Sequence, residues 1–235
     1  MLQDKLGISA AGLKWLAMLT MLIDHIGAVF VPAAGGYSIY YAMRIIGRIA
    51  FPIYCFLLAE GVAHTKNPVK YGLRLFIGML LAEIPFDLAF SGGWDWSSQS
   101  VMVTLLLGFG MALIMNKLDR TKLVPVIVFA FLAELFRTDY GAWGIFMIAL
   151  FVMTRERKDR NNLQLIGMLI ICWFMNSAVI RIAGIRVPIE IFAMLALAPV
   201  FLYSGKKSTG SKAVQTVFYL FYPTHLLVLY IISIL

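Results

Sequence analysis

The sequence predicts an all-α fold, a polytopic membrane helix bundle with about nine transmembrane helices, and three observations carry this prediction. Hydrophobic residues make up 61% of the 235 residues. Charged residues make up 14%, against roughly 25% in an average soluble domain, and mean hydropathy is +0.87. The apolar residues form runs of the length that crosses a bilayer, with the basic residues clustered between them. A soluble fold would lack the polar residues to cover its surface.

Nine apolar runs follow one another along the chain, and a helix of about 20 apolar residues crosses a bilayer core. They cover residues 13–32, 39–62, 70–90, 100–116, 122–137, 140–154, 163–180, 187–203 and 214–234. The fifth and sixth are short and are separated only by Thr138 and Asp139, so a tight helical hairpin or a re-entrant segment is an alternative there. Eight or ten spans are the alternatives to nine. The connections are too short for a soluble domain, so residues 1–235 are expected to form one transmembrane domain.

The distribution of Lys and Arg predicts a cytoplasmic N-terminus and an outer C-terminus, because basic loops stay in the cytoplasm. The N-terminal segment and every second connection hold 14 of the 20 basic residues, the opposite connections hold three, and three lie within spans. The 14 are Lys5, Lys14, Lys66, Lys70, Lys117, Arg120, Lys122, Arg155, Arg157, Lys158, Arg160, Lys206, Lys207 and Lys212. This pattern also argues against a nucleic-acid partner, despite the net charge of +8.

Ionisable side chains within a bilayer are costly unless they are paired or hydrated, so those within the spans are candidate functional residues. They are Asp24, His25, Arg44, Arg48, Glu60, Arg74, Glu83, Asp87, Glu134 and His225. At about 1.5 Å per residue, His25 lies roughly 18 Å from the cytoplasmic end of its span, and Arg48 lies roughly 13–14 Å from the outer end of the next. We therefore expect a central polar cluster, either hydrated or paired with itself.

Lys14 and His25 share one face of the first span, because they are eleven residues apart. A cation at the cytoplasmic lip, with an imidazole roughly 16–17 Å deeper, suits a long ligand with phosphates at the surface and a reactive end at depth. The alternative is a snorkelling interfacial lysine and an unrelated buried histidine.

Arg44 and Arg48 are one helical turn apart and need anionic partners in the membrane. Candidate partners are Asp24, Glu83 and Asp87 on other helices, or an anionic ligand. A structural ion-pair network is the alternative to a functional one. Glu83 and Asp87 could instead orient a catalytic histidine.

Three further features receive structural interpretations. Glu60 and His64 have a spacing that could serve a metal, but no third ligand lies near in sequence, so no metal is expected. Glu190 follows Pro188 and is interpreted as an acid at a helix N-terminus. The two cysteines lie inside apolar runs, so no disulfide framework is indicated.

Several motifs occur in order from the first span to the last. They are LKW at 13–15, MLIDHIG at 21–27, RIIGRIAFP at 44–52, EG at 60–61, EIPFD at 83–87, DYGAWG at 139–144 and FYPTH at 221–225. In these motifs the chain resembles the TraX family, named for the protein that acetylates the N-terminus of F-type conjugative pilin. More distantly, it is similar to membrane acyltransferases that move acetyl groups from cytoplasmic acetyl-CoA onto sugars, including heparan glucosaminide acetyltransferase.

The resemblance implies an acetyltransferase of the bacterial inner membrane that uses acetyl-CoA, contacts membrane lipids and acts on an amine or hydroxyl of a pilin N-terminus or a glycan. In those acyltransferases a basic residue, usually arginine, precedes the histidine of the first span by eleven positions. Lys14 stands at that place here.

Two groups of residues are expected to form the site. The catalytic group is His25, Asp24, Glu83, Asp87 and Arg48, with His25 as general base or transient acetyl carrier and Arg48 stabilising an oxyanion or pairing with the acids. The group expected to bind acetyl-CoA is Lys14, Arg44, Lys66, Lys70, Arg74 and His225. A proton-coupled transporter or permease that uses the same buried cluster is the main alternative, and a non-catalytic assembly factor is the second.

Overall fold

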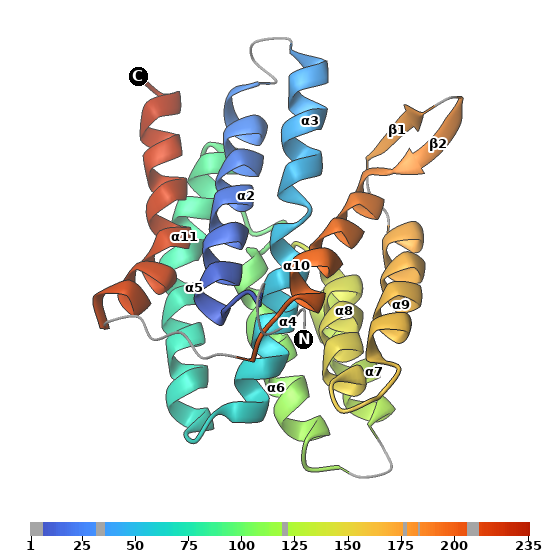
Figure 1. Cartoon of the computed structure of the whole chain (residues 1–235). Coiled ribbons are helices and arrows are strands. Elements are labelled where there is room, and N and C mark those ends of the chain that lie inside the picture. The colour runs from blue at the N-terminus through green and yellow to red at the C-terminus, as the bar shows by residue number, and fades with distance from the viewer. Residues whose placement is uncertain (1–6, 32–35, 119–121, 176–177, 183, 206–211) are drawn as a thin grey trace.

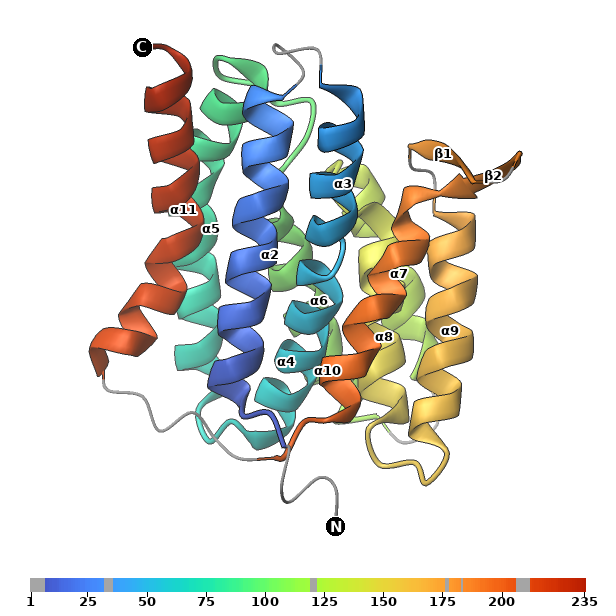
Figure 2. The same cartoon turned by 45° about the horizontal axis from the view of Figure 1, so that its top comes forward.

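The chain folds into a bundle of roughly aligned helices (Figures 1 and 2). The computed structural model describes residues 7–31, 36–118, 122–175, 178–182, 184–205 and 212–235, without the side chains of 212–215. The helices are α2 (Ala10–Phe30), α3 (Tyr37–Gly47), α4 (Ala50–His64), α5 (Pro68–Ser91), α6 (Val101–Met115), α7 (Leu123–Leu135), α8 (Gly141–Thr154), α9 (Arg160–Phe174), the 3₁₀ helix η1 (Ile189–Ala196), α10 (Leu197–Phe201) and α11 (Lys212–Ser233). Each predicted apolar run therefore contains helix, and the helical class is confirmed.

Three helical segments in the described part of the chain are long and apolar enough to cross a membrane. They are Ala10–Phe30, Tyr37–His64 and Thr216–Ser233, and shorter apolar helices accompany them. Helices of the other runs carry exposed apolar side chains, such as Ile127 and Phe131 on α7, which are 66% and 67% exposed. These faces suit a lipid environment, while the count of nine spans stays a prediction.

The expectation of helix throughout is wrong between α9 and η1. The predicted run 163–180 stops being helical at Phe174, and strands β1 (Val179–Ile182) and β2 (Ile185–Pro188) pair antiparallel. Each strand holds one arginine between two apolar residues, as Ile180–Arg181–Ile182 and Ile185–Arg186–Val187, which fits the two-residue period of a strand. Gly184 takes a φ of +83° at the turn, a conformation that glycine adopts without steric cost.

The second predicted run is broken between α3 and α4. Pro52 has no amide hydrogen for the Arg48 carbonyl, and its ring crowds that carbonyl, so a regular helix cannot pass this point. The chain instead makes a tighter bond from the Ile49 amide to the Ile46 carbonyl, at 3.3 Å. The break lies beside both arginines of this span.

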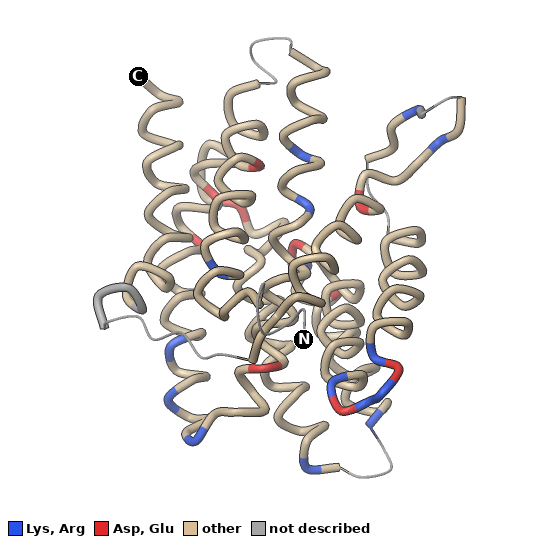
Figure 3. The backbone as a smooth tube through the Cα atoms, viewed as in Figure 1, with Lys and Arg blue, Asp and Glu red and all other residues tan. Residues whose placement is uncertain are grey.

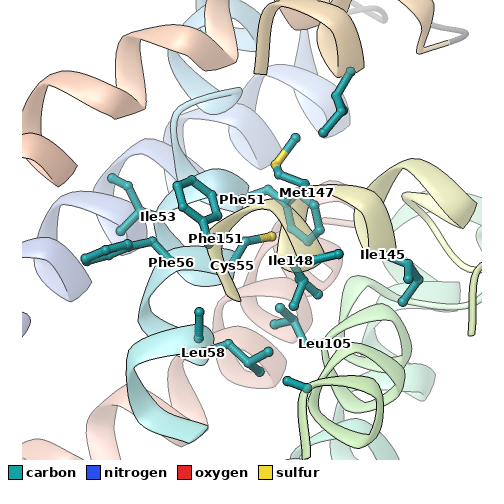
Figure 4. Packing of buried hydrophobic residues seen from close by; sticks show 14 of the residues in the cluster. Phe51, Ile53, Cys55, Phe56, Leu58, Leu105, Ile145, Met147, Ile148 and Phe151 are labelled. Carbon is teal, nitrogen blue, oxygen red and sulfur yellow. The ribbon is translucent and has the colours of Figure 1, made fainter. Parts of the chain in front are cut away.

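The largest apolar core lies between α4, α6 and α8 (Figure 4). Phe51, Ile53 and Cys55 of α4 pack there against α8 residues, including Ile148 and Phe151. On the other side of the bundle α11 packs along α5, and α2 packs along α3. This leaves polar residues of α2, α3, α5 and α11 facing a space inside the bundle.

Lysines and arginines gather at one end of the bundle, at the connections α4–α5, α6–α7 and α8–α9, which we call the basic end (Figure 3). The β1–β2 hairpin lies at the opposite end. The described lysines and arginines of these three connections, which were predicted to share one membrane side, thus lie at one end of the molecule. Of the residues predicted on that side, Lys5, Arg120, Lys206 and Lys207 lie outside the described residues.

Candidate functional site

A cavity of about 910 Å³ extends from the basic end to the middle of the bundle. At the basic end Lys14, Thr65 and Lys70 line it, and at its inner end Asp24 and His25 do so. Its volume is near the upper limit of the roughly 300–1,000 Å³ typical of ligand sites. Lys14 and His25 therefore line one cavity, as their spacing predicts.

Three cations line the part of this cavity nearer the basic end. Lys14 and Arg74 contact aromatic rings of α11, with Lys14 Nζ 4.9 Å from the centre of the Phe218 ring and Arg74 Cζ 5.9 Å from that of Tyr219. Lys70 lies in the first turn of α5, beside its N-cap, where Asn67 Oδ1 accepts a hydrogen bond from the Lys70 amide at 2.9 Å. Cations and aromatic rings together form this wall of the cavity.

Two members of the predicted acetyl-CoA group are placed elsewhere. Among the described residues that line the cavity, Lys66 is absent; it lies exposed in the α4–α5 connection. His225 is also absent from that lining and lies buried behind His25. The remaining four, Lys14, Arg44, Lys70 and Arg74, do line the cavity.

His25 and His225 form a pair whose proton positions follow from the backbone. His225 Nδ1 lies 2.7 Å from the Phe221 carbonyl oxygen, which can only accept, so Nδ1 carries the proton. The other nitrogen of neutral His225, Nε2, is then an acceptor. It lies 2.6 Å from His25 Nδ1, which must donate. His25 Nε2 therefore keeps its lone pair, as a general base or nucleophile requires.

Aromatic contacts hold the pair in place. The two imidazole planes are within 3° of parallel, with centroids 4.9 Å apart. A nitrogen–nitrogen distance of 2.6 Å is too short for stacked rings, so the histidines meet edge to edge. Phe221 stacks on His225 at 4.6 Å, and Phe90 meets His25 edge-on at 5.3 Å.

Asp24, Arg44, Arg48 and Glu190 form an ion network beside this pair. Asp24 accepts from Arg44 Nη1 at 2.6 Å and from Arg48 Nη2 at 3.0 Å. Arg48 Nη1 donates to Glu190 Oε1 at 2.6 Å. Arg48 and both carboxylates are buried, whereas the Arg44 side chain is 24% exposed. Of the three acids named as candidate partners of the arginines, Asp24 is the one that pairs with both, and the interpretation of Glu190 as only a helix-terminal acid is wrong.

Gly47 permits this network. A β-carbon at that position would lie 2.1 Å from Asp24 Oδ1 and 2.2 Å from Asp24 Cβ, far inside van der Waals contact. The glycine in the RIIGR motif thus lets α2 and α3 approach until the carboxylate reaches both guanidinium groups.

Glu83 and Asp87 hold a loop instead of a histidine or an arginine. Glu83 accepts from the Ser100 amide and hydroxyl, at 3.2 and 2.6 Å, where Ser100 precedes α6. Asp87 accepts from the Asp95 amide at 3.2 Å. The expectation that one of them orients His25 or pairs with the arginines is wrong, because both are bonded to the 92–100 connection.

Two residues of the DYGAWG motif, Asp139 and Tyr140, line the inner end of the cavity but were not among the predicted site residues. Asp139 lies in the connection between α7 and α8 and forms no ion pair with a described residue. Its removal from bulk water raises the pKa of its carboxyl to about 6, although Arg48 and Arg44 act in the opposite direction. Tyr140 stacks on Phe51 with centroids 3.6 Å apart.

At the mouth of the cavity, Glu60 pairs with a cation. Arg155 Nε donates to Glu60 Oε1 at 3.0 Å, and His64 Nδ1 lies 3.7 Å from Glu60 Oε2. This contact ties α4 to the start of the α8–α9 connection.

A second, smaller cavity of about 210 Å³ meets the first at the ion network. The two share Tyr40, Arg44, Arg48, Asp139 and Tyr140 in their linings. The smaller cavity extends toward the hairpin end, where Met175, Ala178 and Ile189 line it. The charged cluster thus faces one cavity on each side.

Fold and site together define a helical protein with helices apolar enough to cross a membrane, built around a charged internal cavity. The chain belongs to the TraX family, because the family described as TraX protein matches residues 9–233. It is similar to the "Probable fimbrial assembly protein FimC, serogroup H1" of Dichelobacter nodosus, with 28% identity over 94% of each chain. An uncharacterized protein of Rickettsia prowazekii (strain Madrid E) is 31% identical over 41% of this chain and 33% of its own length. No solved structure matches significantly.

Proposed function

We propose that this protein is a multi-pass acetyltransferase of the bacterial inner membrane that moves an acetyl group from acetyl-CoA to an amine or hydroxyl. The observation that carries the proposal is the cavity that joins the cations of the basic end to His25. CoA has phosphates at one end and the thioester at the other. Lys14, Lys70 and Arg74 suit the phosphates, and the pantetheine arm follows α2 inward to the imidazole.

The proposed chemistry starts from the lone pair on His25 Nε2. The acceptor nitrogen or oxygen attacks the thioester carbonyl carbon, its proton passes to Nε2, the C–S bond breaks and the same proton leaves with the CoA sulfur as a thiol. His225 keeps its hydrogen bond to Nδ1 throughout and so stabilises the imidazolium. In the covalent version Nε2 itself attacks the carbonyl carbon, the C–S bond breaks and CoA leaves as the thiolate. The acceptor then takes the acetyl group from the imidazole, and its proton passes to the thiolate.

The acceptor we favour is the N-terminal amine of a pilin-type protein, with a glycan hydroxyl as the second candidate. The resemblance to the TraX family implies a pilin N-terminus as acceptor, and the D. nodosus relative bears the name of a fimbrial assembly protein. The decisive assay is release of free CoA by the purified protein, with acetylated acceptor as the second product. A proton-coupled transporter or an assembly factor would release none.

The proposed topology has nine spans, with the basic end in the cytoplasm. A reporter inserted near Arg157 should therefore be cytoplasmic and one fused after Leu235 should be outside, because 14 of 20 basic residues are predicted on one side. Fluorescent-protein and alkaline-phosphatase fusions measure the two sides. Reporters that both read as cytoplasmic would contradict the odd number of spans.

Acetyl-CoA should raise the melting temperature of the detergent-solubilised protein, because a ligand that binds the folded state alone stabilises it. Lys70→Ala should reduce this rise, and the reduction should be greatest at low salt, where a phosphate contact is least screened. Lys66→Ala is the matched control, since Lys66 lies four residues away but outside the cavity lining. An equally reduced rise in melting temperature in both variants would mean that CoA binds through the overall positive charge of the basic end and not in the cavity.

A further inference from the structure

The β1–β2 hairpin presents two arginines at the end of the molecule opposite the basic end. Arg181 and Arg186 are directly opposite in the register of the strands, so they leave the same face of the ribbon with β-carbons about 4.5–5.5 Å apart. Both are exposed, and neither forms an ion pair with a residue that the structure describes. Like charges placed directly opposite weaken a two-stranded ribbon. A bound anion would relieve this repulsion.

The base of the hairpin is the rim of the smaller cavity. Ala178 directly precedes β1 and Ile189 directly follows β2, and the Ile189 amide donates to the Ala178 carbonyl at 2.8 Å. Both residues line the smaller cavity, whose inner wall holds Arg48 and Asp139. A molecule held by the hairpin arginines would therefore lie at an entrance to the ion network.

The smaller cavity limits what can enter it. Its volume of about 210 Å³ equals that of about seven water molecules in the liquid, at roughly 30 Å³ each. Such a space takes the end of a chain and no folded domain. Glu190, Arg48 and Asp139 make its inner wall charged, which suits a polar chain end and opposes acyl chains. A polypeptide acceptor would leave most of its length outside, against the hairpin.

We propose that the hairpin is the docking site for a carboxylate-bearing segment of a polypeptide acceptor whose N-terminal end enters the smaller cavity. This inference rests on the proposed function and names how that function selects its substrate. Paired guanidinium groups suit carboxylates, because their planar N–H forks make bidentate hydrogen bonds.

The test compares two synthetic peptides of equal length with free N-termini, one with three Glu after the fourth residue and one with three Lys. The full chain in nanodiscs should acetylate the Glu peptide with a kcat/KM about three- to tenfold higher at low salt, the range expected for exposed charge pairs. High salt should reduce this ratio. The Arg181→Glu/Arg186→Glu variant should reverse the preference, and Arg181→Lys/Arg186→Lys should keep its direction. Stabilisation by acetyl-CoA, measured by melting, verifies that each variant is folded.

A peptide preference that the Glu variant leaves unchanged would overturn the proposal. A second overturning result is equal use of both peptides together with activity that requires phosphatidylglycerol in the nanodisc and loses that requirement in the Glu variant, because the arginines would then hold lipid. If neither peptide is acetylated, the proposed function fails separately. Fluorescence anisotropy of the two labelled peptides then still tests docking: the parent should bind the Glu peptide more tightly, and the Arg181→Glu/Arg186→Glu variant should bind the Lys peptide more tightly.

Discussion

His25→Ala should lower the rate of acetyl transfer by about 10² to 10⁴, the range that a positioned acid–base group supplies, while acetyl-CoA still raises the melting temperature. The physical reason is that His25 Nε2 holds the free lone pair of the histidine pair, whereas the cations of the basic end hold the donor. The measurement is CoA release under saturating acetyl-CoA and acceptor.

His64→Ala is the matched control, because His64 also lines the cavity but lies near its mouth, bonded to the Glu60 carbonyl at 2.9 Å. It should keep activity close to that of the parent. Labelled acetyl-CoA without acceptor separates the two chemical versions: label retained by the parent and lost in His25→Ala identifies a covalent carrier. Parent-like transfer by a folded His25→Ala protein would remove His25 from the mechanism.

Arg48→Ala should destabilise the protein by about 3–5 kcal/mol, because it leaves the buried Glu190 carboxylate without its cation and Asp24 with Arg44 alone. Arg48 donates to Glu190 and Asp24 at 2.6 and 3.0 Å, and all three are buried. The loss is measured as thermal unfolding of the solubilised protein. Arg48→Lys should recover only part of it, since one ammonium cannot reach both acids as the guanidinium does.

Arg157→Ala serves as the comparison for that loss. Arg157 pairs with Asp159 at 2.9 Å on the surface of the basic end, where such pairs contribute about 0–1 kcal/mol. Adding Glu190→Gln to Arg48→Ala should restore part of the lost stability, because it removes a buried charge that has lost its partner. Equal melting temperatures for the Arg48→Ala and Arg157→Ala proteins would show that the network is hydrated and contributes little to stability.

The parts of the site predicted from sequence depend on local spacing. Helical periodicity places Lys14 and His25 on one face, and both line the cavity. The cost of unpaired arginines in a membrane predicted acidic partners for Arg44 and Arg48, and one of the three candidates, Asp24, pairs with both. Residues one or three turns apart lie on the same face of any helix, so their relative position can be predicted without knowing how the helices pack.

The parts that were not predicted depend on contacts between distant segments. His225 is 200 residues from His25, and Glu190 is 142 residues from Arg48. No spacing rule relates such positions. Glu83 accepts a hydrogen bond from the Ser100 amide instead of from an arginine. Ser100 stands at the start of α6, where the amide has no acceptor within the helix.

The hairpin was missed for a different reason. The predicted run 163–180 included Val179 and Ile180, because valine and isoleucine suit a bilayer and a strand equally well. The alternation with Arg181 and Arg186, together with Gly184, held the contrary signal. Apolar content identified the helices, and periodicity would have identified the strands.

The Arg48–Glu190 pair also sets an order for biosynthesis. When the first two apolar segments have left the ribosome, two arginines share the single carboxylate of Asp24, so one positive charge is uncompensated. Its partner belongs to η1 and is made 142 residues later. Until then the nascent chain must keep Arg48 hydrated or near lipid phosphates, and the amino-terminal helices can close around it only after most of the chain has been made.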